Sequence, residues 1–276
     1  MKMTAATRSE LTKVFTTAIW WILAIVLVLY VGMLAAGMAG LFGALSTGQL
    51  GSEAGSPPPD PGGLPLVMYS IATSIGYVFP LLIGTLMVTS EFRHQTLTPT
   101  FLATPARGIA LAAKVVAGIV IGLLFGVIAV VSAVGPAAGI LAAYDIDPLL
   151  SSGDTWLLLG RALLALVLWA IIGIGIGTVV RNQVVAIVIV LAFTQVVEPV
   201  LRVAGGLIEW LGELTKYLPG AASDALVGES FFTGLGGPSG APVATLEWWA
   251  GGLVLLGFAV VLLVIGHFTS WRRDVT

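Results

Sequence analysis

The chain has 276 residues, of which 58% are hydrophobic and only 9% are charged, and its mean hydropathy is +1.05. A soluble domain carries roughly 25% charged residues, so this chain could not cover its own surface with polar groups, and we expect an integral membrane protein. The net charge of −2 gives no sign of nucleic-acid binding. The chain has no cysteine, which excludes a disulfide, a thiolate nucleophile and a zinc–sulfur site.

The segment 1–17 carries three basic residues and is otherwise rich in Thr and Ala. Apolar residues follow Ser9 and Glu10 at helical spacing, which predicts an interfacial helix that leads into the membrane. The next apolar run, 18–41, is too long for the apolar region of a cleaved signal peptide and is predicted to be the first span. The loop 43–65 is rich in Gly, Pro and Ser and contains no Lys or Arg, which is typical of a flexible connection.

Five further apolar runs are predicted to span the membrane. They cover residues 66–88, 112–140, 156–180, 184–206 and 248–268. An acidic loop separates the runs 112–140 and 156–180. The runs 156–180 and 184–206 are separated only by Arg181-Asn182-Gln183, which is too short for anything but a tight reversal. The chain is therefore predicted to be an all-α membrane protein that forms a single transmembrane domain over 1–276, with six spans.

The basic residues predict the orientation. If the N-terminus is cytosolic, the inside segments hold nine of the twelve basic residues, namely Lys2, Arg8, Lys13, Arg93, Arg107, Lys114, Arg181, Arg272 and Arg273. The acids run the other way, since only Glu10, Glu91 and Asp274 fall inside. The positive-inside rule then predicts that both termini are cytosolic.

The fifth span departs from a simple helix. Only the residues 184–197 precede Glu198-Pro199, and at 1.5 Å per residue they reach roughly 21 Å, short of the ~30 Å hydrocarbon core. We therefore expect a broken or re-entrant helical hairpin at the outer surface, over 207–245, before span six. Glu198 and Arg202 lie four apart on one helix and are predicted to form a structural ion pair.

Polar residues on spans two and five are candidates for the lining of a transport pathway: Tyr69, Thr73, Ser74, Tyr77, Thr194 and Gln195. Arg161 lies near the start of span four, where it can extend to the outer interface, and we expect a structural role for it. Gly118, Gly122 and Gly126 share one face of span three, and Gly173, Gly175 and Gly177 lie close together in span four. Such small residues let helices approach closely, and packing within one bundle is the favoured interpretation.

Motifs of enzyme chemistry are missing from the sequence. It contains no GxxxxGK[ST] loop for nucleotide phosphates and no HExxH, and its two histidines, His94 and His267, lie far apart. We therefore expect no catalytic residue, no bound metal and no cofactor in this chain.

Residues 91–114, EFRHQTLTPTFLATPARGIALAAK, form the only long polar interruption that is also basic. Pro99 and Pro105 break any continuous helix and leave a short segment between two bends. Small and hydroxyl residues there surround Leu97, Phe101 and Leu102, so the segment either docks into a groove of a partner or serves only as a basic loop that fixes topology.

The same stretch resembles the cytosolic loop between spans two and three of ABC-2-type permeases, the membrane subunits of bacterial ATP-binding-cassette exporters. That family shows an acid and an arginine after span two, a TL step, an L-ATP-R step and a lysine that opens span three. These correspond here to Glu91, Arg93, Thr96-Leu97, Leu102-Ala103-Thr104-Pro105, Arg107 and Lys114. Gln95 stands where the family usually has glycine.

The resemblance implies a permease of the bacterial inner membrane without its own ATPase site. Two such subunits, alike or similar, would pair with two nucleotide-binding subunits that hold ATP and Mg. The loop 89–111 would carry the coupling helix seated in an ATPase groove. The coupling residues implied are Glu91, Arg93, Thr96, Leu97, Pro99, Phe101, Leu102, Thr104, Pro105 and Arg107. Substrates of the family include drugs, lipids, glycans and peptides, and nothing in the sequence selects among them.

Two alternatives stay open. A secondary transporter without a nucleotide partner is expected to show internal repeats and intramembrane charges; no convincing repeat is visible, and Glu198 with Arg202 is the only candidate pair. A membrane-embedded enzyme or assembly factor would need a polar catalytic cluster, which the sequence does not show. Neither alternative requires the loop 91–114.

Overall fold

The computed structural model describes residues 3–49, 62–96, 106–234 and 245–271. Over these ranges the chain consists of helices and their connections, with no strand. Six of the helical segments are long and apolar enough to cross a membrane. The prediction of an all-helical, multi-pass membrane protein with six candidate spans is therefore confirmed.

The candidate spans follow the predicted order. They are α2 (Ile19–Ser46), α3 with α4 (Leu64–Ser74 and Val78–Arg93), α6 (Arg107–Ala143), α7 (Gly153–Val179), α8 with α9 (Gln183–Ala192 and Glu198–Leu207) and α13 (Trp248–Gly266). A shorter helix, α1 (Met3–Phe15), precedes them, and α10 (Glu209–Thr215), α11 (Pro219–Val227) and α12 (Phe231–Gly234) lie between α9 and α13. The re-entrant character expected of this last region stays a prediction.

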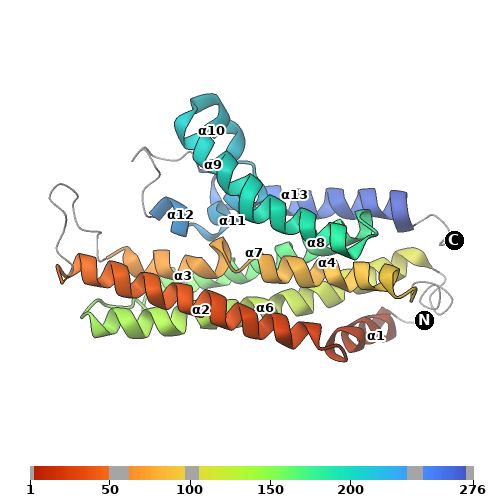
Figure 1. Ribbon diagram of the computed structural model, residues 1–276, viewed down its shortest axis with the longest axis horizontal. Helices are drawn as coiled ribbons and strands as arrows, with labels where there is room; N and C mark the ends of the chain where they lie inside the picture. The colour runs from red at the N-terminus through yellow and green to blue at the C-terminus, as the bar shows by residue number, and fades with distance from the viewer. Residues whose placement is uncertain (1–2, 50–61, 97–105, 235–244, 272–276) are drawn as a thin grey trace.

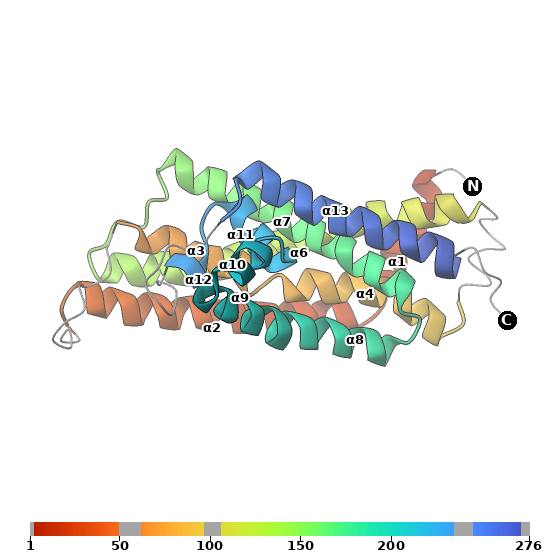
Figure 2. The same cartoon turned by 90° about the horizontal axis from the view of Figure 1, so that it is seen from above.

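The long helices run side by side along the long axis of the molecule, and α7 packs against α4, α6 and α13 (Figures 1 and 2). The helix α1 and the C-terminal part of α13 lie at the same end of this bundle, which an even number of spans requires (Figure 1). The hairpin of α9 and α10 projects away from the side of the bundle. The core is apolar and includes Leu27, Phe125 and Trp169, each with 1% or less of its surface exposed.

The second span is broken, which the sequence analysis did not predict. It consists of α3 and α4, separated by Ile75, Gly76 and Tyr77. Pro80 causes the interruption, because it has no N–H to donate to the carbonyl of Gly76 and its ring would clash with that carbonyl. The Gly76 carbonyl accepts instead from the N–H of Phe79, at 3.2 Å.

The fifth span is continuous, contrary to the break expected at Glu198-Pro199. The helix passes through a π-helical turn, Phe193–Val197, in which the Glu198 N–H donates to the Phe193 carbonyl. This wider turn accommodates Pro199, whose missing N–H would otherwise leave a gap in the α-helical ladder. The 25 residues Gln183–Leu207 then reach about 37 Å, enough to cross the core.

Two glycines bring α4 and α7 into backbone contact. A Cβ at Gly173 would lie 2.1 Å from the carbonyl oxygen of Leu81, and a Cβ at Gly84 would lie 2.1 Å from that of Ala170. Such close approach is the usual means of tight helix packing in lipid, where burial of apolar surface no longer drives association. The glycines of α6 likewise face α7, since a Cβ at Gly118 would lie 2.3 Å from a side-chain carbon of Ile174. These contacts lie within one bundle, as the sequence analysis favoured.

Gly173→Ala is expected to force α4 and α7 apart and to cost about 1–3 kcal/mol of unfolding free energy, because the clash is with backbone. The matched control is Gly160→Ala on the exposed face of the same helix, where a Cβ meets nothing within 4 Å. Unfolding in mixed detergent micelles, followed by circular dichroism, measures both variants. Equal stability of the two variants would contradict the close contact.

The orientation can be tested because the chain has no cysteine of its own. Ser9 on α1 and Thr47 after α2 are both exposed and lie on either side of the first span. In intact spheroplasts a membrane-impermeant maleimide is expected to label Thr47→Cys, whereas Ser9→Cys is labelled only after permeabilisation. The reverse pattern would place the N-terminus outside the cell.

Candidate functional site

Four charged residues meet at the end of the bundle where α1 lies. Glu10 and Lys13 come from α1, Glu91 from the end of α4 and Lys114 from the start of α6. We call these four residues the charge cluster. Glu10 is 5% exposed, Glu91 is 4% exposed and Lys114 is fully buried.

The charges of the cluster alternate in sign around a closed set of contacts. The Lys13 ammonium lies 2.6 Å from Oε1 of Glu10 and 2.6 Å from Oε1 of Glu91. The Lys114 ammonium lies 2.8 Å from Oε1 of Glu91 and is paired with Oε2 of Glu10. Two acids and two bases cancel, which is the condition under which charges of this kind can be buried.

The cluster changes the titration of Lys13. Burial by itself would lower the pKa of this side chain, but the carboxylates of Glu91 and Glu10 outweigh burial and raise the pKa above its ordinary value of 10.5. The stabilisation that Lys13 contributes is therefore complete below about pH 10 and is lost only as the pH rises through the raised pKa. Docking of α1 through Lys13 is expected to be insensitive to pH in the physiological range.

Sequence reasoning identified Glu91 and Lys114 as part of a loop motif but missed their partners on α1. Glu10 and Lys13 lie three apart on a helix and so share a face, which points at the ends of α4 and α6. A signal was present, because Glu10 and Glu91 are two of the three acids in segments predicted to be cytosolic. Each of these two acids in an otherwise basic segment is explained by its ion pair with buried Lys114.

The charge cluster adjoins the predicted coupling loop. A cavity of about 330 Å³ opens beside it and is lined by Lys13 and Glu91 together with His94 and Thr96, the first residues of the loop. Arg93 is exposed and donates to the side chain of Gln183 at 3.5 Å, and Arg107 is partly buried at the start of α6. The remaining predicted coupling residues lie outside the described residues: Leu97, Pro99, Phe101, Leu102, Thr104 and Pro105.

A second polar group lies inside the bundle around Asp224 of α11. Its Oδ1 accepts from the Ser74 hydroxyl at 3.0 Å, and its Oδ2 accepts from the Ser230 hydroxyl at 2.7 Å and pairs with Arg202. The aspartate is 6% exposed, so its charge depends on these partners. Sequence reasoning did not single out Asp224, which follows Arg202 by 22 residues.

The predicted ion pair of Glu198 and Arg202 is not the one that the described residues form. Arg202 pairs with Asp224, and the Glu198 carboxylate, 2% exposed, accepts the backbone N–H groups of Gly220 at 2.6 Å and Ala221 at 3.2 Å. The π-helical turn just before Glu198 changes which way the two side chains point. Their spacing of four residues alone did not reveal that α11 supplies a partner to each.

The predicted pathway residues divide into two groups. Tyr69, Thr73, Ser74, Tyr77 and Thr194 are buried within the bundle, whereas Gln195 is exposed on its surface. The ring of Tyr77 stacks on that of Trp169 with centroids 4.3 Å apart, and its hydroxyl donates to the Thr194 carbonyl at 3.3 Å. The Tyr69 hydroxyl donates to the carbonyl of Pro148 at 2.6 Å. The Thr73 and Thr194 hydroxyls donate to carbonyls one turn earlier in their own helical segments. A pathway role for these five residues stays a prediction.

The described ranges contain no group of three or more His, Cys, Asp or Glu side chains that could hold a metal ion. The charge cluster and the Asp224 group each carry two carboxylates or fewer near one another, and each is neutralised by lysine or arginine. Their chemistry is that of ion pairing between helices, and neither has the arrangement of a nucleophile with its base.

Lys114→Met is expected to destabilise the protein by about 3–5 kcal/mol, because it leaves buried carboxylates without one of their two cations. Unfolding in mixed micelles, followed by circular dichroism, measures the change. Arg8→Met on the exposed face of α1 is the matched control and is expected to change stability little. The double variant Lys114→Met with Glu10→Gln, which restores neutrality, is expected to recover part of the loss. A Lys114→Met protein as stable as the control would contradict the importance of the cluster.

No family model matches the sequence, and no curated protein matches it. The proposed function therefore rests on the residues themselves and on their geometry.

Proposed function

We propose that this chain is the membrane subunit of an ATP-binding-cassette exporter in the bacterial cytoplasmic membrane. Two copies, or this chain and a similar one, form the substrate pathway, and two separate subunits hydrolyse ATP. Support comes from six candidate spans and from the basic loop 91–114 between the second and third of them, whose motif resembles that of ABC-2-type permeases.

The observation that carries the proposal is the charge cluster. Glu91 begins the stretch 91–114 and Lys114 ends it. Lys114 is held to Glu10 of α1 by an ion pair in which both residues are buried, whereas Glu91 is held to α1 through Lys13, whose side chain is 37% exposed. An ion pair with 5% or less of either partner exposed resists separation, because parting the charges would leave each uncompensated in an apolar environment. Movement of the loop therefore moves α1, α4 and α6 together. A loop that served only to fix topology would not need such an anchor.

The backbone contact of α4 with α7 extends this connection through the membrane. Movement at the inner end of α4 is carried along a helix that lies against α7 at Gly84 and Gly173. The energetics are those of a population shift: ATP binding in the partner favours one arrangement of the bundle, and the loop transmits that preference. The transported substrate is a drug, lipid, glycan or peptide.

A secondary transporter is the second candidate. The observation that favours it is the presence of Glu198, Asp224 and Arg202 among the buried or partly buried residues of the helical bundle, since such groups often mark ion pathways. It predicts that the chain alone, reconstituted in vesicles, moves substrate in response to a proton gradient. The exporter proposal predicts no transport without an ATPase partner.

Phe101→Asp is expected to abolish co-purification of an ATPase subunit from native membranes, because it places a charge in the apolar part of the predicted docking segment. The tagged chain is extracted in mild detergent, and its partners are identified by mass spectrometry. Leu150→Asp is the matched control, since Leu150 is an exposed apolar residue in the connection between α6 and α7.

Both variants should insert and fold, as judged by yield and gel filtration. A wild-type chain recovered without any ATPase, under conditions that preserve other membrane complexes, would refute the proposal. Full partner recovery with Phe101→Asp would refute the docking role of the loop.

A further inference from the structure

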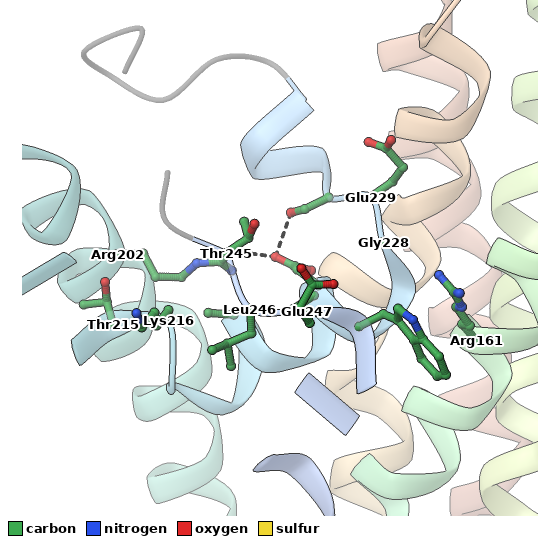
Figure 3. A pocket seen from close by; sticks show the side chains of 14 residues that line it. Arg161, Arg202, Thr215, Lys216, Gly228, Glu229, Thr245, Leu246 and Glu247 are labelled. Carbon is green, nitrogen blue, oxygen red and sulfur yellow. Dashed lines mark hydrogen bonds and ion pairs between the residues drawn. The ribbon is translucent and has the colours of Figure 1, made fainter. Parts of the chain in front are cut away.

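A second cavity, of about 340 Å³, lies between α7, α9, α10, α11 and the start of α13 (Figure 3). It is at the other side of the candidate spans from the charge cluster, because its residues come from the beginnings of α7 and α13 and the end of α9. Its volume falls within the range of about 300–1,000 Å³ that is usual for small-molecule sites. Three basic and three acidic side chains line it.

Half of these charges are already paired. Arg202 and Asp224 form the ion pair of the buried polar group, and Lys216 pairs with Glu213 on its own helix. The charges left over are those of Arg161, Glu229 and Glu247. None of these three forms an ion pair with any described residue, and the adjoining segment 235–244 contains no charged residue that could supply one.

Arg161 is held so that its hydrogen-bonding edge stays available. Its guanidinium carbon lies 4.6 Å from the centre of the Trp248 ring, and Arg161 lies at one side of the cavity (Figure 3). Stacking uses the face of a guanidinium and leaves its N–H donors, which lie in the plane, free for another partner. A planar fork of donors with this freedom suits a phosphate or carboxylate, which it can bind through two parallel hydrogen bonds.

Glu229 and Glu247 give the same cavity two negative groups. Glu247 immediately precedes α13, and its side chain makes no capping hydrogen bond to that helix. Burial raises the pKa of Glu229 above its ordinary value, as expected of a carboxyl that has lost water without gaining a cation. Glu247 is exposed at the mouth of the cavity, and a ligand with an ammonium group would give both carboxylates a positive partner.

The surroundings of the cavity are those of a membrane boundary. Trp248 is the first residue of the sixth candidate span, and tryptophan is typical of the membrane–water interface. Along the same helix Trp249 and Leu253 are more than half exposed, so an apolar chain can lie against α13 from the mouth of the cavity inward. A ligand that fits both the charges and this apolar surface has a zwitterionic head and an acyl tail.

We propose that this cavity binds a phospholipid with a primary-amine headgroup, with its phosphate on Arg161 and its ammonium group on Glu247 and Glu229. The inference does not rest on the exporter proposal, since binding requires only this chain. It adds a specific lipid site to a protein whose apolar surface would otherwise contact lipids without selection.

The test uses the purified full-length chain in detergent and measures binding by calorimetry. The probes are short-chain phosphatidylethanolamine, short-chain phosphatidylglycerol, which has the phosphate without the amine, and soluble glycerophosphoethanolamine, which has the zwitterion without the tail. Phosphatidylethanolamine is expected to bind about tenfold more tightly than phosphatidylglycerol, the usual effect of one charge-assisted hydrogen bond. Equal affinities for the two lipids, or no binding of either, would overturn the proposal.

Substitutions separate the two halves of the site. Glu247→Gln and Glu229→Gln, which keep the shape of the side chain, are each expected to weaken phosphatidylethanolamine binding and to leave phosphatidylglycerol binding unchanged. Arg161→Gln is expected to weaken both lipids about tenfold. Arg8→Gln, on the exposed face of α1 and far from the cavity, should leave the binding of both lipids unchanged.

Loss of both lipids in equal measure on Glu247→Gln would overturn the assignment of the amine, because it would indicate collapse of the cavity rather than loss of a contact. Glycerophosphoethanolamine that binds as tightly as the lipid would overturn the lipid as the source and identify a soluble zwitterion as the ligand. Weak binding of glycerophosphoethanolamine supports the lipid. An unfolding measurement on each variant separates weakened binding from weakened folding.

Discussion

The arrangement of this protein at the end where α1 lies depends on one electrostatic constraint, the burial of two carboxylates with the Lys114 ammonium group, beside the partly exposed Lys13. Each charge alone would be too costly to remove from water, so none of the four residues can leave the cluster without destabilising the others. Since the four come from α1, α4 and α6, the constraint fixes the position of α1 against two candidate spans. It also fixes both flanks of the loop that joins those spans.

Beyond this end, close packing at glycines holds the long helices together, and the Asp224 group adds an ion pair with Arg202 between α11 and α9. Glycines on α4, α6 and α7 permit close approach, and α7 is the helix that these contacts share. The same helix carries Arg161 to the cavity at the other side of the spans. An ion-paired loop region and a partly charged cavity are thus connected by a continuous series of close-packed helices, without any need for a flexible link.

Much of the fold could be predicted from the sequence, because a 30 Å apolar core imposes a length that hydropathy reveals directly. Six candidate spans were found, and each observed helix overlaps its predicted run. The break near Gly76 was missed because Pro80 lies in an otherwise uninterrupted apolar run. The continuity through Pro199 was missed for the opposite reason, since a proline usually ends a helix and only a π-helical turn allows it to pass.

The candidate sites were less accessible to sequence reasoning, because their partners are distant along the chain. Lys114 meets Glu10 across 104 positions, and Arg202 meets Asp224 across 22. A spacing of four residues suggested that Glu198 would be the partner of Arg202, but local spacing could not show that α11 packs against this region. The motif at 91–114 included Glu91 and Lys114 but gave no sign of their partners Glu10 and Lys13 on α1.

The π-helical turn in the fifth span has a consequence for how this part of the chain can vary. A π turn holds one residue more than an α turn, and one residue corresponds to about 100° of rotation around a helix. Everything beyond Val197 is turned by that amount, and Glu198 there faces the amides of α11. The exposed residues Val184, Val185, Val188 and Ile189 of α8 can exchange with other apolar residues, but a deletion of one residue at 193–197 would rotate Glu198 and Arg202 away from α11. The segment therefore tolerates changes of composition far better than changes of length.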